Sequence, residues 1–239
     1  MAQALTSPAE HLIEVRGVGK DYPSGDTVVS AIRCMDFVID DGEFVSIMGQ
    51  SGSGKSTLLA ILGGLNHPTR GRVLVDSLDL YALSSEQRAD FRSEYIGIIF
   101  QSFQLIPYLT VQENVKLPMA ITGVADREQD RLALQVLDKV GLAGKAGRLP
   151  DQLSGGEQER VAIARAIVNS PPILLADEPT GNLDSHTAND VMRLLQQLNR
   201  EGQTIIMVTH NPETCHYSHR TILVQDGECT VPESGALIG

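Results

Sequence analysis

The sequence predicts an α/β fold built on a mainly parallel sheet, and three observations support this class. The segments FVSIM, ILLADE and TIIMV are nearly continuous apolar runs of strand length, which is typical of parallel strands covered on both faces. Segments of helical character separate the strand-like runs, an alternation that favours helices packed on both faces of one sheet. The middle of the chain, between Gln101 and Pro171, has helical patterning and no convincing strand.

The N-terminal part of the chain has two strand-like segments, HLIEVRGV and VVSAIRCMDFVI, with no helical segment between them. This order predicts a small antiparallel β subdomain ahead of the parallel strands. Three further strand-like segments, RVLV, YIGIIF and RTILVQ, complete the predicted set.

The helical middle is predicted from two amphipathic stretches, DREQDRLALQVLDKVGL and EQERVAIARAIVN. Each places apolar residues at the spacing that brings them to one helical face. We therefore expect a single domain over residues 1–239, with its core at about 12–101 and 171–230 and an inserted helical subdomain at about 102–170. The apolar faces consist of Leu132, Val136, Leu137 and Val140 in the first stretch and of Val161, Ala164 and Val168 in the second.

Composition and charge argue against several classes of protein. With 42% apolar residues the chain can bury a proper core, which excludes global disorder. Its 30 acidic residues outnumber 19 basic ones, for a net charge of −11, and this balance disfavours a broad basic surface for nucleic acid or anionic lipid. No apolar run reaches the roughly 20 residues that cross a bilayer, and MAQALTSPAEHL lacks the pattern of a signal peptide. We therefore expect a cytoplasmic protein that binds no nucleic acid.

The stretch GQSGSGKST directly follows the apolar run FVSIM and precedes the helix-like STLLAILGGL. It matches the phosphate-binding pattern G-x-x-x-x-G-K-[ST] in the strand–loop–helix context that this pattern requires. Its glycines let backbone N–H groups turn inward around an anion, and the helix N-terminus adds a positive dipole end. Lys55 is expected on the β- and γ-phosphates and the Ser56 hydroxyl on Mg²⁺. The predicted nucleotide-binding residues are Gly49, Gln50, Ser51, Gly52, Ser53, Gly54, Lys55, Ser56 and Thr57.

Polar side chains follow two more of the apolar runs. ILLADEP ends in Asp177 and Glu178, and TIIMVTHN ends in His210 and Asn211. Because ligands of open α/β sheets bind at the carboxyl ends of the strands, Asp177 is predicted to hold magnesium, directly or through water. Glu178 is predicted to orient or deprotonate an attacking water. For His210, a contact with the γ-phosphate is predicted, and a purely structural histidine is the alternative.

The segment LSGGEQERVAIARA, from Leu153, has two interpretations when it is taken alone. Ser154, Gly155 and Gly156 open an amphipathic helix and present free N–H groups at its positive dipole end, which indicates a second anion site. The alternative is an ordinary helix N-cap with Glu157 as a favourable first-turn acid.

Taken together, these motifs resemble those of the ATP-binding cassette (ABC) ATPases, which are P-loop NTPases with a RecA-like core. The resemblance runs from about Ile13 to Gly227, nearly the whole chain. Tyr22 is similar to the aromatic A-loop residue that stacks on adenine. In the family's order, Gly49–Ser56 matches Walker A, Gln101 the Q-loop, LSGGE the signature motif, Asp177–Glu178 Walker B with its catalytic glutamate, Gly181–Asp184 the D-loop and His210 the H-loop.

The resemblance implies an ATPase that works as a pair of chains with ATP and Mg²⁺. Two copies would sandwich two ATP molecules head to tail, so that Ser154, Gly155, Gly156 and Glu157 contact nucleotide bound on the other copy. Gln101 would contact magnesium and the attacking water. Hydrolysis would remove the bridging phosphate and release the dimer.

Finer features resemble one branch of the family, the lipoprotein-release, macrolide-export and cell-division group (LolD-, MacB- and FtsE-like). They are VSIMGQSGSGKSTLL, FQSFQLIPYLTVQENVKLPM and LLADEPTGNLDS. Glu159 in GGEQER departs from this pattern, because relatives more often carry glutamine there. We expect this carboxylate at a solvated helix position.

The resemblance implies a partner, since the chain would be the ATPase subunit of a membrane complex whose permease is a separate polypeptide. It would sit on the cytoplasmic face of the inner membrane and drive export or lipoprotein release. SFQLIPYLTVQENV has exposed-looking apolar residues that would form a groove for a permease helix, with local core packing as the alternative. Two other functions stay open, a mechanical or regulatory membrane complex and a cytosolic ATPase acting on DNA or ribosomes. The apolar residues are Phe103, Leu105, Ile106, Tyr108 and Leu109.

Overall fold

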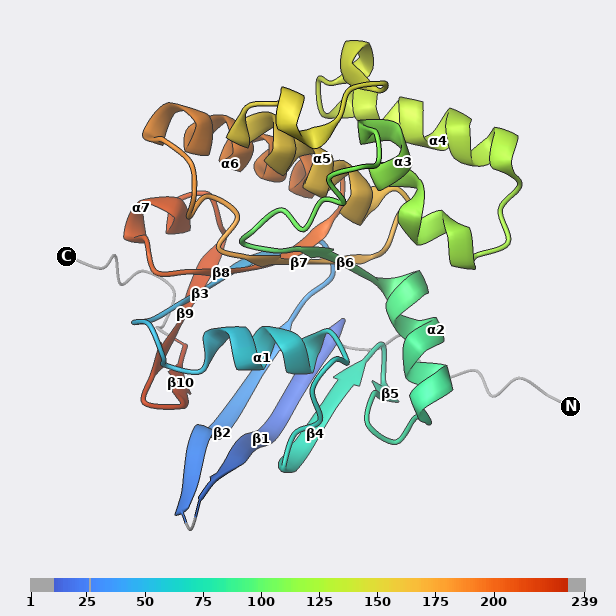
Figure 1. Cartoon of the computed structure of the whole chain (residues 1–239). Coiled ribbons are helices and arrows are strands. Elements are labelled where there is room, and N and C mark those ends of the chain that lie inside the picture. Colours follow the sequence, from blue (N-terminus) through green and yellow to red (C-terminus); the bar gives the residue numbers. More distant parts are fainter. Residues whose placement is uncertain (1–10, 26, 232–239) are drawn as a thin grey trace, which may run out of the picture.

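The computed structural model describes residues 11–25 and 27–231, and it confirms the α/β class. One mixed sheet runs through this part of the chain in the order β5-β4-β1-β2-β10-β9-β3-β8-β7-β6. Figure 1 shows helices on both sides of the sheet and the antiparallel strands β1, β2 and β4 together at one end. The prediction that the N-terminus lacks a signal peptide concerns residues that lie largely outside the described ranges.

The elements follow in chain order. The strands are β1 (Ile13–Ser24), β2 (Thr27–Ile39), β3 (Phe44–Met48), β4 (Arg70–Val75), β5 (Leu78–Asp79), β6 (Ile96–Ile99), β7 (Ile173–Asp177), β8 (Thr204–Thr209), β9 (Arg220–Gln225) and β10 (Glu228–Thr230). The helices are α1 (Lys55–Leu62), α2 (Ser85–Tyr95), α3 (Val111–Lys116), α4 (Asp126–Lys139), α5 (Gly155–Ile167), α6 (Ser185–Arg200) and α7 (Pro212–Cys215). Short 3₁₀ turns are η1 (Leu117–Ile121), η2 (Ala143–Lys145) and η3 (Pro150–Gln152).

Five neighbouring strands, β9, β3, β8, β7 and β6, are parallel and form the centre of the sheet. Their carboxyl ends therefore meet at one edge. The register aligns Met48 with Thr209 and Asp177 with Val208, so the loops that follow β3, β8 and β7 leave the sheet side by side.

Alternate residues of these strands enter two separate cores, which explains their unbroken apolar character. In β7, Ile173 and Leu175 pack into the core beneath α1, whereas Leu174 and Ala176 pack into the core beneath the helices of the middle segment. A strand covered on both faces has no solvent-facing side and so needs no alternation of polar residues.

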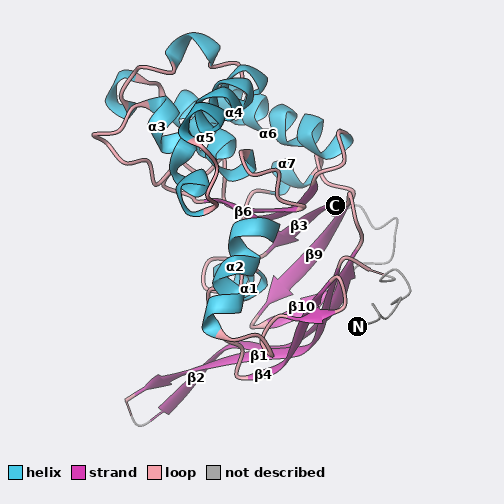
Figure 2. Ribbon diagram, turned by 90° about the vertical axis from the view of Figure 1, so that its right-hand side faces the viewer, coloured by secondary structure: helices cyan, strands magenta, loops and turns pink. Residues whose placement is uncertain are grey.

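The antiparallel end of the sheet confirms the expected N-terminal β arrangement. Strand β1 pairs with β2 and with β4 in antiparallel fashion, and β4 pairs in the same way with β5. Figure 2 shows β1 and β2 extending as a long hairpin away from the helices α3 to α6.

Between β6 and β7 the described chain contains helices and turns only. Helix α5 packs against α3, α4 and α6, and these helices gather on one side of the sheet (Figure 2). Three helices, α2, α3 and α5, begin with a capping box, in which a serine or threonine side chain and the side chain three residues later satisfy each other's backbone N–H. These local signals fix where each helix starts.

The segment after Gln101 differs from the expectation in one respect. Of its five apolar residues only Tyr108 is exposed, and the other four are half-buried, because Leu105 packs against the helical core and Phe103 lies against the start of α5. No helix of the described residues is long and apolar enough to span a membrane.

Candidate nucleotide and catalytic site

A hollow of about 790 Å³ opens at the carboxyl edge of the parallel strands. This volume is in the range of pockets that hold a ligand of nucleotide size. The loop between β3 and α1 forms one side, and the residues after β6, β7 and β8 form the other. The lining residues are Ala31, Met48, Gly49, Gln50, Ser51, Gly52, Gly54, Lys55, Ser56, Thr57, Gln101, Glu178, His210 and Pro212.

Two glycines of the loop are required by close backbone approaches. A Cβ on Gly49 would lie 2.1 Å from the Val224 carbonyl oxygen, and one on Gly54 would lie 2.3 Å from the Ala31 carbonyl oxygen. Gly54 also has a φ of 101°, in the left-handed region that disfavours any side chain. The loop can therefore pass close to β2 and β9 and turn its backbone toward the hollow.

The start of α1 is suited to an anion. Its N-cap residue Gly54 offers no side-chain cap, and no acidic residue lies in the first turn, so the free N–H groups and the dipole end are unopposed. The buried hydroxyl of Ser53 has no hydrogen-bond partner among the described residues. It is therefore a further donor that could bind an anion at this helix end. Lys55 is 5% exposed, and its Nζ donates to the Gln50 carbonyl oxygen at 2.8 Å. The ammonium is thus folded over the loop and within reach of a phosphate.

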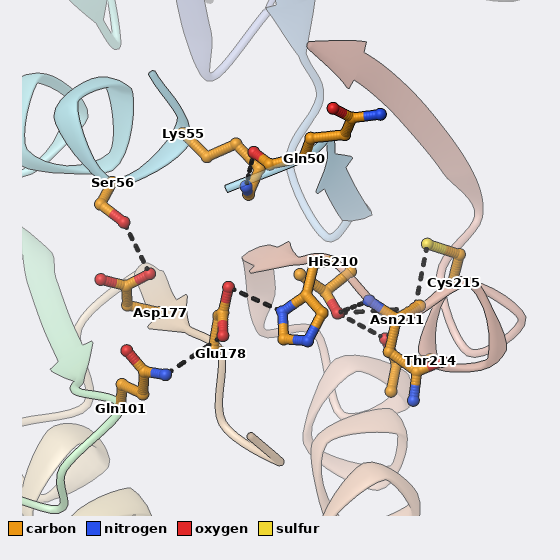
Figure 3. Close-up of polar contacts among 11 residues, drawn as sticks. Gln50, Lys55, Ser56, Gln101, Asp177, Glu178, His210, Asn211, Thr214 and Cys215 are labelled. Atoms are coloured by element: carbon orange, nitrogen blue, oxygen red, sulfur yellow. Dashed lines mark hydrogen bonds and ion pairs between the residues drawn. The ribbon is translucent and has the colours of Figure 1, made fainter. Parts of the chain in front are cut away.

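The Ser56 hydroxyl donates to Asp177 Oδ1 at 3.2 Å, as Figure 3 shows. The two residues come from α1 and from the end of β7, so this contact joins the loop to the neighbouring strand. Burial raises the pKa of the Asp177 carboxyl, because desolvation disfavours a lone negative charge. A hydroxyl and a partly desolvated carboxylate are oxygen ligands of the kind Mg²⁺ takes, and the residues present fit that ion.

The Glu178 carboxylate lies between two polar side chains, those of Gln101 and His210. Its Oε2 accepts a hydrogen bond from Gln101 Nε2 at 3.2 Å, and its Oε1 lies 2.9 Å from His210 Nδ1 (Figure 3). Glu178 has a φ of 48°, an unusual value for a non-glycine residue. That turn aims its carboxylate away from Asp177 and toward the residues that follow β6 and β8.

The D-loop packs against the same group. Asn182 Nδ2 donates to the Gln101 carbonyl oxygen at 2.8 Å, and a Cβ on Gly181 would lie 3.4 Å from both Gln101 Nε2 and Glu178 Oε2. Asp184 caps α6 by accepting from the backbone N–H groups of His186 and Thr187. Hydrogen bonds from Thr187 lower the pKa of the Asp184 carboxyl.

The signature segment does not line the hollow of its own chain. Ser154 caps α5 in a capping box with Glu157. The Glu157 carboxylate also pairs with Lys145, and the hydrogen bond from that lysine lowers the pKa of Glu157. Gly156 is closed in by Thr187, since a Cβ there would lie 2.1 Å from the Thr187 methyl group.

The prediction for Glu159 was wrong, because this residue is buried rather than solvated. It is 1% exposed, and neither carboxylate oxygen has a hydrogen-bond partner among the described residues. Burial raises the pKa of Glu159 to about 8. The physical reason is that α5 is buried on most of its circumference. A charged residue in this helix is therefore not necessarily exposed to solvent.

Tyr22 is not among the residues that line the hollow. It is 37% exposed on β1, where its hydroxyl accepts a hydrogen bond from Asn66 Nδ2 and its ring lies beneath Lys20 Nζ at 4.9 Å. Adenine stacking by Tyr22 therefore stays a prediction.

Several residues of the site were not anticipated from the sequence. Ala31, Met48 and Pro212 line the hollow, and nothing in their residue type marks them. Asn182 could have been found, because an amide lies within the stretch GNLD that was already singled out.

A glycine loop between a central parallel strand and a helix, with a hydroxyl and a carboxylate beside it, defines a P-loop nucleotide hydrolase. Residues 32–181 match the family model described as ABC transporter. The chain belongs to the ABC transporter family and is an ATP-binding ATPase.

Curated relatives agree with this assignment. The chain is 44% identical to an uncharacterized ABC transporter ATP-binding protein, YknY of Bacillus subtilis, over 94% of this chain and 97% of the relative. It is 45% identical to the macrolide export ATP-binding/permease protein MacB of Chlorobium luteolum, over 92% of this chain but 33% of that longer protein. It is 46% identical to the pyoverdine export ATP-binding/permease protein PvdT of Pseudomonas syringae, over 90% and 33% respectively.

Solved structures show the same architecture. A dimeric post-hydrolysis state of the ATP-binding cassette MJ0796, bound to ADP and Pi, has a TM-score of 0.85 and 42% identity, covering 92% of this chain and 97% of that one. The cbiO1 structure from Clostridium perfringens, part of the ABC transporter complex cbiONQ, has a TM-score of 0.83 and 28% identity, covering 93% and 88%.

Proposed function

We propose that this chain is the energy-coupling subunit of an ABC export or lipoprotein-release complex, hydrolysing Mg-ATP to drive a separate permease. The observation that carries the catalytic part is the cluster of Gln101, Glu178 and His210 beside the Ser56–Asp177 pair and the Lys55 loop. A carboxylate, an amide, an imidazole and a glycine loop thus line one hollow, and this combination supports the roles of base, water-orienting group and phosphate-binding loop.

The residues divide the work of hydrolysis. The loop N–H groups and Lys55 hold the β- and γ-phosphates. Ser56, Asp177 and Gln101 are the oxygen groups that would hold Mg²⁺, which neutralises charge on the phosphate oxygens when it is bound. Glu178 accepts the proton of the attacking water, or orients that water. His210 holds the Oε1 atom of the Glu178 carboxylate and contacts the γ-phosphate.

A second copy of the chain completes the site. Ser154, Gly155, Gly156 and Glu157 lie at the start of α5 and do not line their own hollow. Ser154 and Gly155 are exposed there, Glu157 is half-buried and Gly156 is buried. The similar MJ0796 structure, which is bound to ADP and Pi, is a dimer. In a head-to-tail dimer the helix end would meet the γ-phosphate of the partner copy, with Asp184 at the junction.

A surface hollow of about 200 Å³ between the end of β6 and the helical segment supports the permease part. Phe100, Pro118 and Ile121 line it with apolar surface, and Ile121 is 78% exposed. Such a groove fits a short apolar helix. The relatives MacB and PvdT are named as ATP-binding/permease proteins and match this chain over a third of their length. The complex would place this chain on the cytoplasmic face of the inner membrane.

The substitution Glu178→Gln tests the catalytic role. It removes the proton acceptor but keeps the shape, so steady-state hydrolysis should fall by about 100- to 10,000-fold, the range typical of a general base. ATP should still bind, and the variant should run as an ATP-dependent dimer on a sizing column. Glu94→Gln, at an exposed position of α2, is the matched control. Normal turnover in the Glu178→Gln variant would refute the role.

Co-purification tests the partner. The tagged chain, isolated from detergent-extracted membranes, should carry an integral membrane permease with it. Exchange of Ile121 for aspartate should release that permease while leaving ATP hydrolysis by the isolated chain unchanged. Recovery of DNA or ribosomal proteins instead of a membrane protein would overturn the transporter assignment.

A further inference from the structure

Two consecutive residues after the Q-loop glutamine have a strained backbone. Phe103 has a φ of 57° and Gln104 a φ of 52°. Neither is glycine, and a left-handed conformation is unfavourable for a residue that has a side chain. A pair of such residues persists only where the surroundings hold it. Gln101, whose amide contacts Glu178, lies two residues before Phe103.

One side chain holds this pair. Arg165 Nη1 donates to the Gln104 carbonyl oxygen at 2.5 Å, and Arg165 Nη2 donates to the Phe103 carbonyl oxygen at 2.8 Å. The planar guanidinium is pre-shaped for two adjacent acceptors. Burial lowers the pKa of Arg165, which shows that the cation is placed there at a desolvation cost. The two carbonyls and the nearby Glu159 carboxyl offset that cost.

Arg165 lies near the end of α5 and connects three parts of the molecule. Its helix begins at the capped Ser154. The Phe103 ring reaches that start, since it lies about 4.0 Å from where a Cβ of Gly155 would be. Arg165 also lines the surface hollow near Ile121 and Phe100. The same guanidinium thus contacts the Q-loop backbone and borders the groove assigned to the permease.

We infer that Arg165 is a positioning residue for hydrolysis, which clamps the Phe103 and Gln104 carbonyls and so keeps Gln101 in register with Glu178. This inference rests on the roles proposed above for Gln101 and Glu178. Without the clamp the strained pair relaxes toward ordinary backbone angles, and the amide of Gln101 leaves the carboxylate. A permease helix seated in the hollow would act on the same clamp.

The test compares Arg165→Met and Arg165→Lys with wild type, using the full chain and saturating Mg-ATP. Methionine keeps a long apolar side chain but lacks the guanidinium group. The loss of its two charge-assisted hydrogen bonds should lower kcat by about 10- to 100-fold. Lysine keeps the charge but cannot bind both carbonyls in the plane, so it should restore kcat in part. The Kd of a fluorescent ATP analogue should stay within about twofold. Arg127→Met, at an exposed position on α4, is the control and should keep the wild-type kcat.

A double-mutant cycle separates positioning from general damage. If Arg165 acts through Gln101, then Arg165→Met should lower kcat little further once Gln101→Ala is present. The inference would be overturned if the kcat losses of the two single variants multiplied in full in the double mutant, or if Arg165→Met kept the wild-type kcat. A wild-type kcat in Gln101→Ala would instead refute the role proposed for Gln101. Should Arg165→Met fail to fold by circular dichroism, the same cycle is run with Arg165→Lys, which retains the cation.

Discussion

Glu159 is a carboxyl group whose environment opposes its charge. It has no hydrogen-bond partner among the described residues, and the one charge acting on it is Arg165, on the same helix. Arg165 donates its hydrogen bonds to the Phe103 and Gln104 carbonyl oxygens. The folded protein therefore favours the protonated form of Glu159, whereas the unfolded chain ionises this group near its usual pKa of about 4.3.

This difference predicts that the protein loses stability as the pH rises. Because the folded-state pKa is raised to about 8, the contribution of Glu159 is fully present below about pH 4 and is lost as the pH rises through 8. The free energy of unfolding should fall by up to about 1.4 kcal/mol per pH unit across this window. Urea unfolding of Glu159→Gln should lack this component, whereas Glu94→Gln should keep it. Equal slopes in wild type and Glu159→Gln would contradict the prediction.

Lys55 provides a second prediction at the scale of one residue. Its ammonium is held over the loop by the Gln50 carbonyl, and among the described residues Lys55 is the only lysine or arginine that lines the hollow. Lys55→Ala should weaken binding of a fluorescent ATP analogue by at least tenfold, since a charge-assisted contact contributes about 1.5–3 kcal/mol. Lys116→Ala, a lysine of the helical segment that pairs with Asp130, should bind ATP normally. Undiminished affinity in Lys55→Ala would exclude it from the phosphate site.

At the scale of elements, the N-cap residue of α5 is Ser154. Ser154 caps the helix, and we propose that it also meets nucleotide on the partner copy. Ser154→Arg should leave ATP binding to the monomer intact but block ATP-dependent dimers on a sizing column. Losing a cap costs about 1 kcal/mol by itself, and Ser84→Arg, which removes the equivalent cap of α2, controls for that loss. Intact dimers in Ser154→Arg would count against the trans contact.

Elements with a strong periodic pattern were predictable, and those defined by tertiary contacts were not. FVSIM, ILLADE and TIIMV are strands because both faces of each are buried, and this burial leaves a visible apolar run. Strands β5 and β10, of two and three residues, are too short to carry a pattern. Glu159 could not be placed because the burial of α5 depends on neighbours far away in the chain. The glycine loop and the two carboxylates at the end of β7 were predictable because their chemistry requires particular residues in fixed order.

For the whole molecule, the proposed dimer makes each active site a product of two chains. Lys55→Ala destroys the loop half of a site, and Ser154→Arg destroys the helix half. A mixed dimer of the two variants contains one site with both defects and one site with neither. Mixing two nearly inactive preparations should therefore restore measurable ATP hydrolysis, up to about half that of an equal amount of dimer. Activity that stays at the sum of the separate preparations would argue for sites complete within one chain.

The order β3-β8-β7 has a consequence for how the chain acquires its ligand during synthesis. The glycine loop ends by Thr57, yet the strand that pairs beside it, β8, begins at Thr204, and β7 pairs only with β8 and β6. A nascent chain that has already exposed the entire loop still lacks the neighbours that shape it. Nucleotide therefore cannot assist the early steps of folding, and ATP should stabilise only chains translated nearly to their C-terminus.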